Sequence, residues 1–266
     1  MRSYISMICL LSLVIVVMVA AIFYQRYFLE VQFVKSASIT NIEPPSKEFP
    51  KETSWISLFN GVSLDGWTIK ISGEPLGNDR RETFRVVNGA ISINYDNYES
   101  WNGAFGHLFY SARFSYYILQ LEYRFHGHQL LDANSLDWAW RNSGVMIHAQ
   151  PPEDMKLNQG FPVSLEVQLL GAGEGEQRST GNVCSPGTHI RLKKSLVSQH
   201  CIKSSSNSFS TSEWIHLEVE VLGDRAIRHF INGDLVLNYS SPVLDLWSAE
   251  SRLVRDRQND QVEVAS

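Results

Sequence analysis

The sequence FPVSLEVQLLG, residues 161–171, contains the alternation on which the fold prediction rests. Successive side chains of a β-strand point to opposite faces, so the alternating leucine and valine residues would face a core. Glu166 and Gln168 would then face the other way. A carboxylate and an amide two residues apart, beside glycine-rich chain, fit either an ordinary solvated face or the floor of a binding site.

The same alternation recurs along the chain, with turn residues between the runs. Residues 117–125, 143–148 and 214–221 alternate in this way, and no long amphipathic helix pattern separates them. Asn-Gly pairs at 88–89 and 232–233 predict hairpins, because both residues accept positive φ. Many short strands joined by turns predict an all-β sandwich.

The composition limits the classes of function. The chain has 266 residues, of which 44% are hydrophobic and 19% charged, and a net charge of -5. This length is enough for one large or two small domains. The acidic balance gives no reason to expect a nucleic-acid partner.

The N-terminus differs in character from the rest. Residues 5–24 carry no charged side chain, and an apolar helix needs about 20 residues to span a membrane. No convincing small-x-small cleavage site is present, so we expect an uncleaved membrane anchor within residues 1–30, with a cleaved signal peptide as the alternative. Both interpretations predict export to the cell envelope or periplasm. Residues 31–54, rich in proline and polar residues, predict a linker.

Two cysteines lie in the part that would be exported. Cys184 and Cys201 are candidates for a disulfide, which would stabilise the fold by about 3 kcal/mol. Two unpaired thiols are the alternative. His189 and His200 lie nearby, but the spacing is a poor signature for zinc.

Polar residues on the non-core faces of several predicted strands suggest a site. If these strands are neighbours, carboxylates, a guanidinium, an imidazole and amides would gather on one sheet face. Such a mixture can bind sugar hydroxyls and move protons. The alternative is a solvated face with cross-strand ion pairs. The residues concerned are Gln120, Glu122, Arg124, His148, Glu166 and Gln168.

The segment RNSG, residues 141–144, precedes one of these strands and combines a cation, an amide and a glycine that permits close approach of a ligand. Trp101, Trp138 and Trp140 come before it. Aromatic rings can stack on sugar faces, although core packing is the commoner fate of a single tryptophan.

Several motifs, in order and at plausible spacing, resemble the 3-keto-disaccharide hydrolase domain family (DUF1080). The resemblance covers about residues 55–243 and implies a concanavalin A-like jelly-roll sandwich of two antiparallel sheets, with the site on the concave sheet. The motifs are SLFNGVSLDGW (57–67), GHLFYSARFSYYILQLEYRF (106–125), RNSGVMIH (141–148), SLEVQLLG (164–171), EWIHLEVEV (213–221) and HFINGDLVLNY (229–239).

The resemblance implies an enzyme that cleaves 3-keto-glycosides or 3-keto-disaccharides. The ketone acidifies the hydrogen at C2, so a base can remove it, the aglycone leaves by elimination, and water then adds, giving net hydrolysis. No cofactor is certain, and a divalent metal at Glu and His ligands is possible. The expected roles are Glu166 as base, His148 as base or acid, Arg141 and Asn142, or Arg124, at the carbonyl oxygen, and Gln168, Glu122 and His107 at hydroxyls.

Two alternatives remain open: a carbohydrate-binding, lectin-like module without catalysis, and a truncated inactive copy. The second follows from the C-terminus, where relatives carry closing strands and this chain carries a charged tail. A missing strand would leave an open sheet edge; a short helix over 248–257 is possible. The expected organisation is 1–30 anchor or signal, 31–54 linker, 55–244 jelly roll and 245–266 atypical tail.

Overall fold

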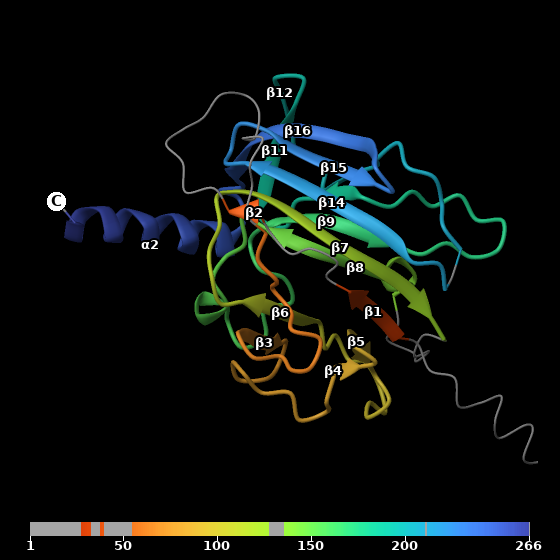
Figure 1. Cartoon of the computed structure of the whole chain (residues 1–266). Coiled ribbons are helices and arrows are strands. Elements are labelled where there is room, and N and C mark those ends of the chain that lie inside the picture. Colours follow the sequence, from red (N-terminus) through yellow and green to blue (C-terminus); the bar gives the residue numbers. More distant parts are fainter. Residues whose placement is uncertain (1–27, 33–37, 40–54, 128–135, 211, 266) are drawn as a thin grey trace, which may run out of the picture.

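The computed structural model describes residues 28–32, 38–39, 55–127, 136–210 and 212–265 (Figure 1). This part of the chain consists mostly of antiparallel β-strands, with a single α-helix. The prediction of an all-β sandwich is confirmed at that level. The predicted N-terminal hydrophobic helix over 5–24 lies outside the described residues, and within the described ranges no helix is long and apolar enough to cross a membrane.

The largest sheet has ten strands. Strand β7 lies in its middle and pairs with β14 along most of its length, so the sheet is continuous across residues far apart in sequence. Its order is β12 (Ser195–Val197), β11 (Thr188–Leu192), β16 (Asp234–Leu244), β15 (Ile227–Ile231), β14 (Ile215–Leu222), β7 (Tyr116–His126), β1 (Phe28–Gln32), β5 (Ala90–Asn94) and β4 (Phe84–Val87), with β2 (Ser38–Ile39) also paired to β7.

A smaller sheet of four strands packs against it and carries the sequence with which the prediction began. In Figure 1 this sheet lies behind β7 and β14. The described part of the chain also contains a separate two-stranded sheet and two 3-10 turns. The elements are β13 (Cys201–Ile202), β10 (Asn182–Cys184), β9 (Leu165–Leu170) and β8 (Asn142–Ile147); β3 (Trp67–Ile71) and β6 (Gly106–Tyr110); and η1 (Asp137–Ala139) and η2 (Pro152–Asp154).

The two larger sheets enclose one apolar core. Leu165 and Val167 of β9, and Leu217 and Val219 of β14, are completely buried and belong to the same cluster. Burying each such side chain stabilises the fold by about 1.5–3 kcal/mol. Because alternate residues of β9 enter this core, the intervening residues must face away from it.

Two strands fall in stretches that the sequence analysis assigned to the anchor and the linker. Strand β1 adds to the large sheet between β5 and β7, and β2 pairs with residues 117–118 of β7. Backbone groups here therefore join the sheet, although the composition of residues 31–54 predicted a linker.

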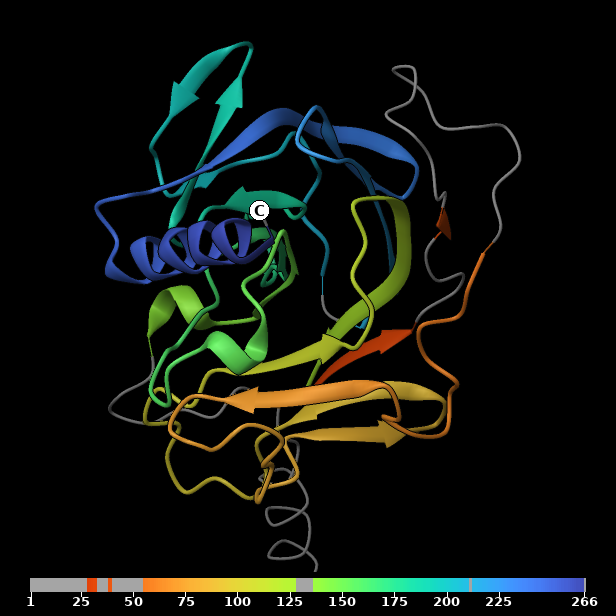
Figure 2. The ribbon, with the colours of Figure 1, turned by 90° about the vertical axis from the view of Figure 1, so that its left-hand side faces the viewer.

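The last strand before the charged tail is not an open sheet edge, although β8, at the end of the four-stranded sheet, pairs only with β9 among the described strands. Strand β16 lies between β15 and β11, so both of its edges are paired. The tail then forms helix α2 (Ala249–Ala265), which projects from one side of the sandwich (Figures 1 and 2). The hydroxyl of Ser251, fully buried, donates to the carbonyl of Gly187 at 2.6 Å, and Lys156 pairs with Glu250 at 3.0 Å. These contacts attach the helix to the body.

One titratable side chain lies inside the core. His229 of β15 is fully buried, and its Nδ1 lies 2.8 Å from the carbonyl oxygen of Gly181. Because a carbonyl only accepts, Nδ1 donates, and Nε2 accepts from the Tyr239 hydroxyl at 3.0 Å. Burial lowers the pKa of His229 from 6.5 to about 4. The ring is thus held neutral.

We expect this histidine to make the protein sensitive to acid. The unfolded chain binds a proton near pH 6.5 while the folded state binds it only near 4, so the free energy of unfolding falls as pH drops between these values, by about 3 kcal/mol from this group. Urea unfolding of wild type and His229→Gln between pH 7.5 and 4 measures it. The difference in the free energy of unfolding between wild type and the variant should shrink toward pH 4. A difference that does not change with pH would show that His229 is not held neutral by burial.

Candidate functional site

The face of the four-stranded sheet that points away from the core carries Glu166. The cross-strand partners of Glu166 are Met146 on β8 and Cys184 on β10. Cys184 in turn lies opposite Cys201 on β13, and the two form a disulfide. Glu166 therefore lies between a thioether and a disulfide, in a row of side chains that offers no charge to pair with it.

Glycine at position 144 makes room for the carboxylate. A Cβ built on Gly144 would lie 2.5 Å from both Cγ and Oε1 of Glu166, closer than real Cβ contacts allow. The glycine of the RNSG segment thus admits a protein side chain across the strand. This is a more specific reason for the glycine than the close approach of a ligand.

The environment of Glu166 changes its acidity. Burial raises the pKa of Glu166 from 4.5 to about 7, because an ionised carboxylate with little access to water is disfavoured. No hydrogen bond or ion pair of its carboxylate is found within the described residues. A carboxyl group that titrates near neutrality can accept and release protons at physiological pH.

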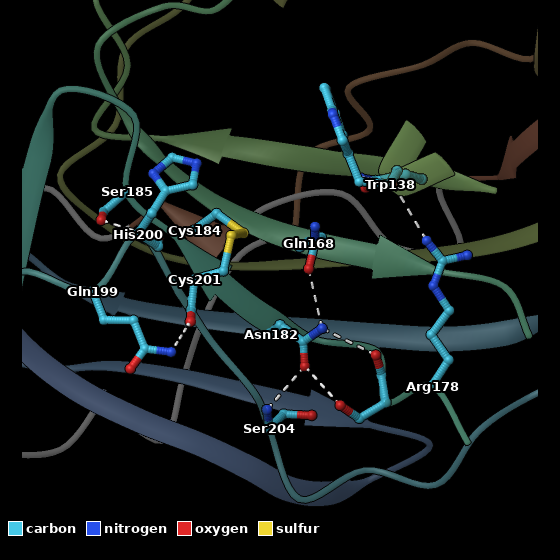
Figure 3. Close-up of a disulfide and its surroundings, with 12 residues drawn as sticks. Trp138, Gln168, Arg178, Asn182, Cys184, Ser185, Gln199, His200, Cys201 and Ser204 are labelled. Atoms are coloured by element: carbon cyan, nitrogen blue, oxygen red, sulfur yellow. Dashed lines mark hydrogen bonds between the residues drawn. A yellow bond between two sulfur atoms is a disulfide. The ribbon is translucent and has the colours of Figure 1, made fainter. Parts of the chain in front are cut away.

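Gln168 lies next to Glu166 on the same face and has a fixed orientation (Figure 3). Its Oε1 accepts from Nδ2 of Asn182 at 3.1 Å. Asn182 is itself held, since its Oδ1 accepts from the backbone N–H of Ser204 and the hydroxyl of Ser179, both at 2.9 Å. The Gln168 amide nitrogen is consequently directed away from Asn182, where it can donate to a ligand.

A hollow of about 1540 Å³ extends over this face, and Glu166 and Gln168 both border it. One wall is aromatic. The ring of Phe105 lies 4.5 Å from that of Phe161 and stacks on Trp138, 5.9 Å away and within 13° of parallel. Trp138 is 51% exposed. The other face of its ring is therefore available for stacking.

The main chain that carries Trp138 is held to the sheet edge. The Trp138 carbonyl accepts from Nδ2 of Asn142 at 3.0 Å, and Arg178 donates to the carbonyls of Trp140 and Gly171. Asn142 Oδ1 is buried and has no hydrogen-bond partner among the residues that the structure describes, and Asn142 borders the hollow. The oxygen itself has almost no solvent exposure, so a ligand hydroxyl would reach it only after the side chain rotates.

Arg141 does not border the hollow, unlike Arg178. Its Nη1 donates to the carbonyl of Ala172 at 2.9 Å, and its guanidinium lies 4.3 Å from the centre of the Trp140 ring. The structure therefore places it as a packing and hydrogen-bonding partner of the loops at the end of the sheet.

The two predicted histidines differ in their surroundings. His107 borders the hollow, and its Nε2 donates to the carbonyl of Gly160 at 2.6 Å; burial lowers its pKa, so the ring is neutral. His148 follows β8 with a φ of 49°, which takes it out of the strand alternation. Desolvation lowers the pKa of His148, opposed by a hydrogen bond with the backbone of Gly223 and by the Asp224 carboxylate. It borders the hollow but faces the turn between β14 and β15.

The expectation that strand 117–125 shares a polar face with Glu166 is wrong. Glu122 and Arg124 alternate with completely or nearly completely buried residues of β7, so they lie on the outer face of the ten-stranded sheet. Glu122 is opposite His216, and Arg124 lies 4.5 Å from the Trp214 ring. The two sheets stack through their apolar faces, which puts these polar faces on opposite sides of the sandwich.

The disulfide between Cys184 and Cys201 is confirmed. The position of the disulfide beside Glu166 was not predicted from the sequence, because only the strand register reveals it. Within the ranges that the structure describes, no group of three His, Cys, Asp or Glu residues could hold a metal ion. Phe105, Phe161 and Arg178 also border the hollow but were not identified from the sequence, since single aromatic residues and arginines carry no distinctive spacing.

The family of the chain follows from its similarity to known proteins. Residues 54–253 match the 3-keto-alpha-glucoside-1,2-lyase-like domain. The chain belongs to this family, as the sequence motifs predicted, and a carbohydrate-related function follows from it. No curated protein and no solved structure gave a significant match.

Replacement of Glu166 by glutamine should stabilise the protein at alkaline pH. The folded state binds the proton of Glu166 more tightly than the unfolded state, so its contribution to stability is complete below pH 4.5 and is lost as pH rises through 7. Glu166→Gln should therefore raise the free energy of unfolding at pH 8 by up to about 3 kcal/mol.

Urea unfolding of wild type and Glu166→Gln at pH 8 and at pH 4 measures this effect. The gain in the free energy of unfolding should be present at pH 8 and absent at pH 4. Glu122→Gln, on the outer face, is the control and should change stability by no more than about 0.5 kcal/mol. Equal stability of wild type and Glu166→Gln at pH 8 would show that Glu166 is well solvated.

Proposed function

We propose that this protein is an exported enzyme that cleaves 3-keto-glycosides by removing the C2 proton and eliminating the aglycone, with Glu166 as the base. The observation that carries the proposal is the carboxylate of Glu166, which borders a hollow with ample room for a disaccharide, lacks a polar partner among the described residues and titrates near pH 7. Membership of the 1,2-lyase-like family supports elimination as the reaction type. For the sandwich of this protein we propose the concanavalin A-like jelly-roll topology that the family resemblance implies.

The proposed step balances without a redox partner. The Glu166 carboxylate takes the proton from C2, and the electrons of that C–H bond form the enolate of the C3 ketone. As the ketone re-forms, a C1–C2 double bond forms and the bond from C1 to the aglycone oxygen breaks. The departing oxygen takes a proton from water, and Glu166 returns its own proton to water. Addition of water across C1–C2 would complete a net hydrolysis.

Two amides are placed to hold the substrate. The Gln168 amide nitrogen can donate to the ketone oxygen, where negative charge develops, and fixed donors at such a position stabilise the transition state. Its orientation depends on Asn182. A rotation of the Asn142 side chain would turn its Oδ1, which has no partner among the described residues and is closed off from solvent, toward a sugar hydroxyl.

The aromatic wall supplies an apolar surface for the substrate. The exposed face of Trp138, backed by Phe105, fits the C–H face of a pyranose ring. Trp140 is less suited, because the guanidinium groups of Arg141 and Arg178 lie over its ring. We assign Trp138, among the three tryptophans near the loop, to substrate stacking.

Export is part of the proposal. The disulfide supports it, since disulfides persist mainly in oxidising compartments. Residues 5–24 supply the apolar segment that export requires. Attachment to the membrane by this segment stays a prediction.

The decisive test supplies the purified protein with a 3-keto-disaccharide and with the same compound deuterated at C2. Turnover should slow with the deuterated substrate, because the C–H bond breaks in the elimination, and kcat/KM should rise with pH through about 7. Glu166→Gln should lose about 10²–10⁴-fold in rate, whereas Glu122→Gln should keep wild-type activity. Saturable binding of the sugar without any product would instead identify a carbohydrate-binding module.

Gly144→Ala should displace the base while leaving the fold intact. The added methyl group would lie 2.5 Å from the Glu166 side chain, which must move, and a misplaced base lowers kcat by about 10²-fold. Gly173→Ala is the matched control, because its Cβ would meet no atom closer than 3.4 Å. Full activity of Gly144→Ala with the 3-keto-disaccharide would show that Glu166 need not occupy its present position.

A further inference from the structure

We propose that the Cys184–Cys201 disulfide is a positioning group for Glu166, because it ties β13 to β10 and so holds the wall that keeps water from one side of the carboxylate. The inference rests on the proposed function in one respect: it takes Glu166 to be the base. The disulfide would then act on the function of the site as well as on the stability of the fold.

The strand register places the bond beside the carboxylate. Cys184 is the direct partner of Glu166 across β9 and β10, and Cys201 is the direct partner of Cys184 across β10 and β13. Directly opposed residues of adjacent antiparallel strands project from the same face. Cys184 is 1% exposed, and both cysteines border the same hollow as Glu166. The sulfur atoms therefore form part of the wall beside the carboxylate. Figure 3 shows the disulfide that joins Cys184 and Cys201.

The bond holds the start of the segment that carries Cys201. The chain after β13 is also held by hydrogen bonds, from Ser204 to Asn182 and from Ser204 and Ser206 to the carbonyl of Thr180, so the disulfide acts mainly on β13 and the chain before it. Strand β13 has only two residues, Cys201 and Ile202, and pairs with β10 alone. The neighbouring chain adds hydrogen bonds to the His200 carbonyl from the backbone N–H and hydroxyl of Ser185. So short a strand at a sheet edge has few ladder hydrogen bonds, whereas a disulfide that closes a loop of this size restrains the chain by about 3 kcal/mol.

Burial rather than charge sets the acidity of Glu166. Its neighbours on β8 are Gly144 and Met146, its neighbour on β9 is Gln168, and its neighbour on β10 is Cys184, none of them charged. Desolvation is the cause of its raised pKa. The titratable side chains that border the hollow from nearby elements include His107 on β6, His148 after β8, Arg178 after β9 and His200 before β13.

Loss of the bond should therefore expose the carboxylate. A dithiol reductant would transfer two electrons and two protons to the disulfide, giving two thiols and the oxidised reductant. Strand β13 and the chain before it could then move away from β10 and admit water. With better hydration Glu166 would ionise more readily and become a weaker base.

The test follows Glu166 directly. The carboxyl carbon of Glu166, assigned by comparison with Glu166→Gln, is titrated by ¹³C NMR in the oxidised protein, in the protein reduced with dithiothreitol, and in the double variant Cys184→Ala/Cys201→Ala. We expect the pKa of Glu166 to fall by about one unit in the last two. The rise of kcat/KM with pH, which follows the ionisation of Glu166, should move to lower pH by the same amount.

Controls separate this role from general stabilisation. Tyr98→Phe loses a buried hydrogen bond to Thr83 in the separate, smaller apolar cluster and should leave the Glu166 titration unchanged. Cys184→Val/Cys201→Val keeps a packed cross-strand pair, and serves if the alanine variant does not fold. An unchanged Glu166 titration in the folded reduced protein, or in either folded double variant, would overturn the proposal. Because the titration needs no sugar, a shift without cleavage of 3-keto-glycosides would refute only the proposed function.

Discussion

The structure depends on the burial of alternate residues of β9 between two stacked sheets. Leu165 and Val167 are wholly inside the core, so Glu166 and Gln168 are held on the opposite face by the period of two of an extended chain. A shift of the register by one residue would put the carboxylate in the core and the apolar side chains in the hollow. The same burial that stabilises the sandwich therefore sets the direction of the candidate site.

Around Glu166 the protein accepts an unfavourable environment. A thioether, a disulfide and a glycine surround the carboxylate, and its own burial raises its pKa to about 7. A salt bridge or hydrogen-bond donor would stabilise the ionised form and make the group a weaker base. The region therefore lowers stability at neutral pH, and such a loss of stability is common at functional sites. The supporting chain from Ser204 through Asn182 to Gln168 shows that the surrounding polar groups are fixed in place.

The charged tail of the chain forms a helix that docks on the body of the protein. Relatives of this family were expected to close the sheet with further strands, and residues 245–266 lack that pattern. Here β11 already covers the edge of β16, and α2 docks through Ser251 and Glu250. Figure 2 shows this helix running beside the segment that carries η2. The charged composition of the tail suits a helix that is largely exposed.

The alternation of residues 161–171, the Asn-Gly hairpins and the family motifs were sufficient to predict a β-sandwich, and the two cysteines offered the disulfide that the structure shows. They also singled out Glu166, whose role as a base stays a prediction. These features are local in sequence or are carried by residue type, and strand periodicity states which side chains share a face of one strand. It does not state which faces of different strands lie together. Only the stacking of the sheets separates Glu122 and Arg124 from Glu166, and only the cross-strand register brings Cys184 and Gly144 beside it, because both are determined by the burial of apolar surface between residues distant in the chain.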